Sequence, residues 1–280
     1  MSECHDNVWY GPYGPSSGDD IRIKDSQPAR GALAGEIAVV TGSRGRLGGI
    51  WTQALRDAGA LVIESDTPLV AIDEIRSNCD ITKREDIERA LDCWTSLYGL
   101  PTILVNNAGV DDRPTPTTMH GARPVVAKAM ADCNLLGTYN MLTMLGGEMA
   151  KAGRGSIINI ASLYGLVVPD MRYYGKSGFE KHAMYGATKA GVVSLTQYFA
   201  AYYGPKGVRV NALAPGGVVN PGDPLTGQDD GFKARYTARI PMGRMCQPED
   251  LGGPLVFLAS KASSFVNGVT IPVDGGFLAW

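Results

Sequence analysis

Short apolar runs alternate with longer amphipathic segments along the chain from Gly35 to its end. This rhythm predicts repeated strand–helix units around a parallel sheet. The runs lack polar alternation, as expected of strands that helices cover on both faces. The sequence therefore predicts a single α/β domain over residues 35–280, with a doubly wound parallel sheet between two helical layers. The expected strands are Ile37–Thr41, Leu61–Glu64, Thr102–Asn106, Ser156–Ala161, Val208–Ala214 and Thr270–Val273.

Between two of these strands, residues Lys83–Tyr98 have the pattern of an amphipathic helix. The segment follows Thr82, and Glu85 stands three residues further on, which is the spacing of a capping box. Apolar residues that include Ile87 and Trp94 recur at the spacing of one helix face. We therefore expect a helix that Thr82 caps and that packs its apolar face on the sheet.

Residues 1–34 show little periodicity and are expected to form an N-terminal extension. They contain no basic start leading into an apolar run, so they do not resemble a signal peptide. No apolar stretch approaches the roughly 20 residues that a membrane helix needs. The five cysteines occur singly, which favours a reducing compartment, and the net charge of -2 gives no reason to expect nucleic acid. These features predict a cytoplasmic protein that binds a small-molecule substrate and neither membrane nor nucleic acid.

A glycine-rich turn joins the first expected strand to the helix that follows it. After Thr41, the turn consists of Gly42, Ser43, Arg44, Gly45, Arg46, Leu47 and Gly48. Glycine lets the main chain turn sharply and approach a pyrophosphate, and the first N–H groups of a helix favour negative charge. The order of strand, turn and helix therefore predicts a dinucleotide site of the Rossmann type, lined by these residues.

Asp66 and two arginines bear on the choice between NAD and NADP. Asp66 follows the second strand, where a carboxylate can accept hydrogen bonds from the adenosine ribose and repels a 2′-phosphate. Arg44 and Arg46 favour the opposite choice, because a guanidinium binds phosphate well. We expect NAD to be preferred, with NADP as the alternative.

Further motifs occur in order along the chain. They are Asn106-Asn107-Ala108-Gly109, Asn134-Leu135-Leu136-Gly137, Ser162 after Ile158-Asn159-Ile160-Ala161, Tyr185-Gly186-Ala187-Thr188-Lys189, Arg209 to Gly216, and Val273-Asp274-Gly275-Gly276. Together with the turn, they resemble the motifs of the short-chain dehydrogenase/reductase family from about Gly35 to the C-terminus. The resemblance implies an NAD(P)-dependent oxidoreductase that forms a homodimer or homotetramer. It also implies a catalytic set of Asn134, Ser162, Tyr185 and Lys189.

The same resemblance implies how the cofactor would be held. Asp80 and Ile81 would contact the adenine, and Asn107, Ala108 and Gly109 would line the cleft. Pro215, Gly216 and Val218 would contact the nicotinamide amide, whereas Tyr185 and Lys189 would lie at the nicotinamide and its ribose.

The turn departs from the family's usual TGxxxGxG pattern. Gly45 and Arg46 make it TGxxGxxG, a form more frequent in the family's longer branch that modifies sugar nucleotides. The chain lacks the residues for that branch's additional substrate domain. The departure leaves the conformation of the turn and the cofactor preference open.

A second departure is the long stretch Leu163–Met184 between Ser162 and Tyr185. Both of its ends are fixed at catalytic residues, so we expect it near the substrate mouth. Its residues include Arg172, Tyr173, Tyr174, Lys176, Lys181 and His182. Cations in the pocket would suit a carboxylate or phosphate on the substrate. The alternative is a loop that faces solvent or another subunit.

Tyr185 and Lys189 are four residues apart, so on a helix they project from one face. A nearby positive charge favours the phenolate, which can take a proton from an alcohol; the phenol can return it to a ketone. Ser162 would hydrogen-bond the reacting oxygen, and Asn134 would hold a water that relays the proton. No metal is expected, because the three histidines lack ligand spacing and are predicted at the surface. They are His5, His120 and His182.

Residues Val218–Met242 are rich in glycine and proline and predict a mobile lid that leads into a short helix. Pro224, Leu225 and Tyr236 are candidates for substrate contact. The expected function is reversible interconversion of a secondary alcohol and a ketone, with a polar or anionic sugar derivative as substrate. Two alternatives are a catalytically idle nucleotide-binding scaffold and an epimerase or dehydratase that recycles its cofactor.

Overall fold

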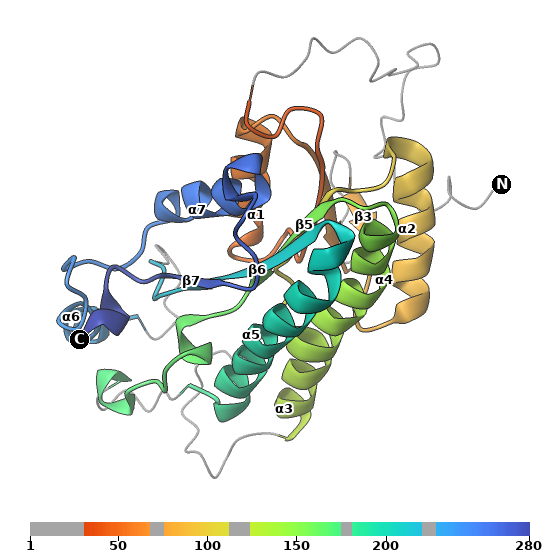
Figure 1. Ribbon diagram of the computed structural model, residues 1–280. Helices are drawn as coiled ribbons and strands as arrows, with labels where there is room; N and C mark the ends of the chain where they lie inside the picture. Colours follow the sequence, from red (N-terminus) through yellow and green to blue (C-terminus); the bar gives the residue numbers. More distant parts are fainter. Residues whose placement is uncertain (1–30, 68–75, 112–123, 175–180, 220–227) are drawn as a thin grey trace, which may run out of the picture.

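The computed structural model describes residues 31–67, 76–111, 124–174, 181–219 and 228–280. Seven parallel strands form one sheet in the order β3-β2-β1-β4-β5-β6-β7 (Figure 1). The strands are β1 (Ile37–Thr41), β2 (Leu61–Asp66), β3 (Arg76–Asn78), β4 (Ile103–Asn106), β5 (Gly155–Ile160), β6 (Val208–Pro215) and β7 (Thr270–Val273). The predicted doubly wound α/β fold is confirmed.

Helices cover both faces of the sheet, as Figure 1 shows. On one face lie α1 (Gly48–Asp57) and α7 (Glu249–Ala259), and on the other lie α2 (Arg84–Tyr98), α4 (Thr138–Lys151) and α5 (Ala183–Tyr203). The remaining α- and π-helices are α3 (Pro124–Met130), η4 (Ala131–Gly137) and α6 (Asp230–Thr237). Short 3-10 helices span Leu163–Gly165 (η5), Met171–Tyr174 (η6), Gly204–Lys206 (η7), Lys261–Ser263 (η9) and Phe277–Ala279 (η10).

Alternate residues of each central strand enter two different cores. In β1, Val39 packs beneath α2 and α4, whereas Ala38 and Val40 pack beneath α1 and α7. In β4, Leu104 joins the first core and Val105 the second. Burial on both faces explains why these strands read as continuous apolar runs.

The parallel arrangement brings the carboxyl ends of the strands to one edge of the sheet. β1 and β4 are neighbours although two strands separate them in sequence. The strands before β4 are added to one side of β1 and those from β4 onward to the other, so the strand order reverses between β1 and β4. In such sheets, ligands bind in the crevice outside the strand ends at this switch point. The turn after β1, Asn107 after β4 and Ser162 after β5 therefore lie along one edge.

The start of α2 differs from the prediction. The helix spans Arg84–Tyr98 nearly as expected, but its cap residue, Lys83, makes no side-chain capping bond. The Thr82 hydroxyl instead donates to the Asp80 carboxylate at 2.7 Å. The predicted capping box is therefore wrong: the cap residue is Lys83, and the Thr82 hydroxyl bonds Asp80 and accepts no helix N–H among the bonds that the structure shows. At this helix start, Asp86 accepts a bond from the Asp80 N–H.

Two features of the fold differ from the sequence prediction: an additional strand and the start of the packed domain. Strand β3 was not predicted, since it has three residues and no apolar side chain among them. Leu33 is fully buried beside α1, and its N–H donates to the carbonyl of Ala58. The packed part of the domain thus includes Leu33, which was expected to belong to the N-terminal extension. Residues 1–30 of that extension lie outside the described residues. Across the parts of the chain that the structure describes, no helix is long and apolar enough to cross a membrane.

Candidate active site

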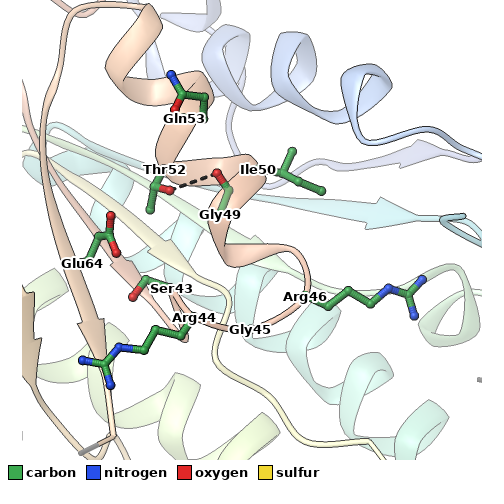
Figure 2. A pocket seen from close by; sticks show the side chains of 9 residues that line it. All are labelled: Ser43, Arg44, Gly45, Arg46, Gly49, Ile50, Thr52, Gln53 and Glu64. Atoms are coloured by element: carbon green, nitrogen blue, oxygen red, sulfur yellow. Dashed lines mark hydrogen bonds between the residues drawn. The ribbon is translucent and has the colours of Figure 1, made fainter. Parts of the chain in front are cut away.

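Glycine is required twice in the turn after β1. Gly42 has φ +62, and a Cβ there would lie 2.6 Å from the Cα of Ala108. A Cβ on Gly48 would lie 2.3 Å from the carbonyl oxygen of Ser43. The turn also lines a pocket of about 560 Å³ together with the first residues of α1 and Glu64 of β2 (Figure 2). The turn is thus tight although it has Gly45 and Arg46 where the family's usual pattern has its glycine one position later.

Asn107 fixes the turn from the end of β4. Its side-chain amide donates to the carbonyls of Thr41 at 3.0 Å and Gly42 at 2.8 Å, and its Oδ1 accepts from the Trp51 indole at 2.8 Å. The N–H groups of Asn107 and Ala108 both donate to the Thr41 hydroxyl at 3.1 Å. These bonds join the predicted cleft residues to the start of the turn and, through Trp51, to α1.

The residues of the turn fit the phosphates of a dinucleotide. The Ser43 hydroxyl is buried and has no hydrogen-bond partner among the described residues, although buried polar atoms are normally paired. Leu47, the cap residue of α1, supplies no side-chain capping bond, and the first turn of α1 holds no acid. The N–H groups of Gly48 and Ile50 already donate to the carbonyls of Gly45 and Leu47, so an anion at this helix start would mainly meet the positive end of the helix dipole.

Asp66 lies beside the turn, as predicted. Its two carboxylate oxygens accept the N–H groups of Arg44 and Thr67, both at 2.8 Å. The guanidinium of Arg44 reaches the carbonyl of Thr67 at 3.5 Å. The carboxylate is thus held at the end of β2 while the Arg44 side chain stays at the surface.

Asp80 and Ile81 follow β3 on the same side of the molecule. Partial burial alone would raise the pKa of Asp80, but hydrogen bonds from Thr82 and the charge of Lys83 hold it below its usual value. The Ile81 side chain is buried and packs close to Gly137. Ile81 is thus a core residue, and its predicted adenine contact stays a prediction.

The start of α5 and the segment after β5 pack closely together. A Cβ on Gly165 would lie 2.7 Å from the main chain of Lys189, and one on Gly186 would lie 3.0 Å from the carbonyl of Tyr164. Ser162, buried just before η5, accepts the Tyr164 N–H on its hydroxyl. Small residues at these contacts bring Ser162 to the first turns of α5, which carry Tyr185 and Lys189.

Lys189 is buried, and its ammonium donates to the carbonyl of Ile160 at the end of β5 at 2.7 Å. The ammonium lies 5.9 Å from the centre of the Tyr185 ring. A Cβ on Gly109 would lie 3.7 Å from this ammonium and 3.2 Å from Oδ1 of Asn134. Gly109 therefore leaves room beside the buried cation at the strand edge.

Asn134 occupies the π-helix η4, a geometry that is frequent at functional sites. Its amide exchanges two bonds with Val110, accepting at 2.7 Å and donating at 2.9 Å, and also reaches the Thr188 hydroxyl. Asn134 thus links the loop after β4 to α5. The water relay expected for this residue stays a prediction.

The end of β6 carries the residues expected at the nicotinamide. The Gly216 N–H donates to the carbonyl of Val273 in β7, which fixes the chain just after Pro215. The Arg46 guanidinium donates to the carbonyl of Val218 at 2.6 Å. The phosphate turn and the segment after β6 therefore meet through Arg46, which takes the family's usual glycine position.

The long stretch between Ser162 and Tyr185 was expected near the substrate mouth, and its described residues lie in different places. Arg172 is exposed and pairs with Asp170, while Tyr173 and Tyr174 are buried in a cluster with α6. Lys181 pairs with Asp111 and lies near Tyr185. Lys176 lies outside the described residues. One part of the stretch thus borders Tyr185, and another contributes to the core.

His182 differs from the surface residue that was expected. It caps α5, with its Nδ1 accepting the Met184 N–H at 3.1 Å, and its Nε2 is buried. His5 and His120 lie outside the described residues. Capping requires a side-chain acceptor at the helix start, and this role was not recognised because histidine is an uncommon cap.

The short helix expected after the lid is present as α6, and the lid itself stays a prediction. Tyr236 is 2% exposed, packs on Phe232 and Phe277, and accepts the Gly217 N–H on its hydroxyl at 2.8 Å. Its predicted substrate contact is therefore wrong, because the ring belongs to the core. Pro224 and Leu225 lie outside the described residues.

Comparisons with known proteins decide the family. Residues 64–278 match the family model described as "Enoyl-(Acyl carrier protein) reductase". The chain belongs to the short-chain dehydrogenase/reductase family. It is therefore an NAD(P)-dependent oxidoreductase, as the fold and motifs indicate.

Three relatives illustrate the family's range. A cis-4-hydroxycyclohexanecarboxylate dehydrogenase of Sinomonas cyclohexanicum is 31% identical over 259 residues, covering 89% of this chain and 98% of the relative. A short-chain dehydrogenase of Leptospira borgpetersenii with bound NAD+ has a TM-score of 0.77 and 30% identity, covering 86% and 92% of the two chains. A gluconate 5-dehydrogenase of Burkholderia cenocepacia, in complex with NADP and tartrate, has a TM-score of 0.76 and 28% identity, covering 88% and 96%.

The crowding at Gly42 leads to a prediction on dinucleotide binding. Gly42→Ala is expected to weaken the affinity for NAD(H) by about 10-fold or more, because the methyl group meets Ala108 and the positive φ is strained. Gly35→Ala is the matched control, since Gly35 also has a positive φ but no atom within 4 Å of its added Cβ. Calorimetric titration of both variants measures the difference. Equal affinities would mean that the turn does not bind the phosphates.

Proposed function

We propose that this dehydrogenase interconverts a secondary alcohol and a ketone, with Tyr185 as the acid/base group. The observation that carries this proposal is the grouping of the Tyr185 ring, the buried Lys189 ammonium and Gly109 at one sheet edge. A phenol near a buried cation can form the phenolate and accept a proton. Ser162, on the segment packed against the same helix turns, would hydrogen-bond the reacting oxygen.

In alcohol oxidation, the hydroxyl proton would pass to Tyr185 while the carbon that bears this hydroxyl loses hydride to the nicotinamide. The bound nicotinamide supplies the hydride acceptor, or the hydride donor in the reverse direction. Ser162 would stabilise the oxygen as its bond to carbon becomes a carbonyl. Lys189 would place a positive charge beside Tyr185 and contact the nicotinamide ribose, and Asn134 would keep the loop after β4 on α5. The turn residues and Asn107 would orient the dinucleotide.

A hydroxy acid is the substrate class that we propose. Support comes from the relatives, of which one is named for a hydroxycyclohexanecarboxylate and another for gluconate. The cations of the long stretch support it less directly than expected, because Arg172 and Lys181 already pair with carboxylates. An epimerase or dehydratase that recycles the cofactor, and an idle scaffold, remain the competing readings.

The test is a panel of alcohols assayed through nicotinamide absorbance with NAD+ and NADP+. The panel contains 4-hydroxycyclohexanecarboxylate and gluconate, each beside its uncharged amide. We expect the acids to be oxidised with higher kcat/KM than the amides. Equal rates for acid and amide would refute the hydroxy-acid proposal, and no oxidation of any alcohol would favour the idle scaffold.

NAD is proposed as the preferred cofactor because the Asp66 carboxylate is held at the end of β2. Asp66→Ala is expected to shift the ratio of kcat/KM for NADP+ over NAD+ upward by about 10- to 100-fold, the size of one charge-assisted hydrogen bond. Asp57→Ala is the control, since Asp57 is an exposed acid at the end of α1. An unchanged ratio in Asp66→Ala would show that this carboxylate does not select the cofactor.

A homodimer or homotetramer is also part of the proposal. Exposed apolar residues gather on η4, α4 and α5, where Tyr198 stacks on Tyr202 and Tyr139 lies near Phe199. An exposed apolar patch of this kind is typical of an interface. Light scattering after gel filtration is expected to give the mass of two or four chains.

A further inference from the structure

A second lysine lies closer to the Tyr185 ring than Lys189 does. The ammonium of Lys181 lies 4.3 Å from the ring centre, against 5.9 Å for Lys189. Lys181 belongs to the long stretch before α5 and lies four residues before Tyr185. A cation at this distance from an aromatic ring is attracted to it. The catalytic tyrosine thus has two cationic neighbours.

Asp111 holds Lys181 in this position. The two side chains form an ion pair across 70 residues of sequence, and Asp111 lies on the segment that follows β4 and Gly109. The Lys181 side chain is 20% exposed, so the pair is partly shielded from water. The contact therefore connects the loop after β4 to the start of α5 on the side of the cleft.

The described groups around Lys181 keep it charged. Burial alone would lower the pKa of Lys181, but Asp111, Tyr185 and Tyr174 together raise it above its usual value. These three come from the segment after β4, from α5 and from η6 respectively. Tyr174, in turn, hydrogen-bonds Tyr164, whose burial raises its pKa strongly. Tyr164 and Tyr174 thus stay neutral, and Asp111 provides the opposite charge.

We infer that Lys181 is a positioning residue that orients the Tyr185 ring and stabilises its phenolate, with Asp111 as its anchor. This inference rests on the proposed acid/base role of Tyr185. Lys189 also supports the phenolate, but it is directed to the carbonyl of Ile160. Lys181 lies on the part of the chain that departs from the family's usual length, so it adds a charge to the four-residue catalytic set. Asp111 already occupies the ammonium, which argues against Lys181 as the receptor for a substrate carboxylate.

The test is a titration of tyrosinate absorbance, which needs no substrate. Because the chain has 12 tyrosines, each protein is compared with its own Tyr185→Phe counterpart, and the difference isolates Tyr185. Lys181→Met is expected to move the midpoint upward by about one pH unit, the size for a neighbouring charge that an acid partly offsets. Lys181→Arg is expected to keep the midpoint near that of the wild type, because it restores the charge.

A matched control and a kinetic readout complete the design. Arg172→Ala removes an exposed cation of the same stretch and is expected to leave the midpoint unchanged. With an alcohol that the wild type oxidises, Lys181→Met is expected to move the acidic limb of the kcat profile upward by a similar amount. Circular dichroism confirms that the variants are folded.

Each outcome of these titrations has one reading. An unchanged midpoint in a folded Lys181→Met protein would overturn the inference, as would an equal shift in Arg172→Ala. If the midpoint moves but no alcohol is oxidised, the inference on Lys181 stands and the proposed reaction fails.

Discussion

Tyr185→Phe is expected to lower kcat for alcohol oxidation by about 10²- to 10⁴-fold, the usual contribution of a positioned acid/base group. The substitution removes only the hydroxyl, so the ring and the cation contacts of Lys181 and Lys189 are retained. We expect the affinity for NAD(H) to change little, because the substitution leaves the turn after β1, Asn107 and Lys189 in place. Steady-state kinetics and calorimetric titration measure the two quantities separately.

Tyr98→Phe provides the control for a lost tyrosine hydroxyl. Tyr98 ends α2, whose last residues precede β4 and thus lie at the amino edge of the sheet, opposite the site. Its kcat is expected to equal that of the wild type. If Tyr185→Phe also retained full activity, the acid/base role of Tyr185 would be wrong.

Trp51→Ala is expected to lower the free energy of unfolding by about 3–5 kcal/mol, as for other large aromatic side chains removed from a core. Trp51 is fully buried between α1 and the sheet, and its indole N–H bonds Asn107. Chemical denaturation measures the loss. Because Asn107 holds the carbonyl of Gly42, we also expect the remaining folded protein to bind NAD(H) more weakly.

The pair of variants Trp51→Phe and Trp94→Phe separates the hydrogen bond from the packing. Both indoles are almost fully buried, but the Trp94 N–H has no partner among the described residues. Trp51→Phe leaves the Asn107 oxygen unpaired and is expected to cost about 1–3 kcal/mol more than Trp94→Phe. Equal costs would mean that the indole bond to Asn107 contributes nothing to stability.

The sequence was sufficient where one physical cause dominates. Strands β1 and β4 are buried on both faces, so their apolar runs are continuous and recognisable. Gly42 and Gly48 cannot carry a side chain, and the spacing of Tyr185 and Lys189 follows from the pitch of a helix. These local constraints are enough to predict the fold and the tight turn after β1; the catalytic set stays a prediction.

Features that depend on distant partners could not be predicted. Thr82 bonds Asp80 while the helix starts one residue later at the cap Lys83, and Tyr236 became a core residue because Gly217 and Phe277 surround it. The pairing of Lys181 with Asp111 spans 70 residues. Such contacts arise from tertiary packing, which outweighs local propensity.

The central claim is tested most directly by an alcohol that carries deuterium on the carbinol carbon. The substrate is the hydroxy acid on which the wild type is most active, incubated with NAD+ and analysed by mass spectrometry. Our account predicts one deuterium on the nicotinamide ring of NADH and a ketone product in equal amount. Deuterium retained in an epimerised or dehydrated product, with no reduced cofactor formed, would contradict it.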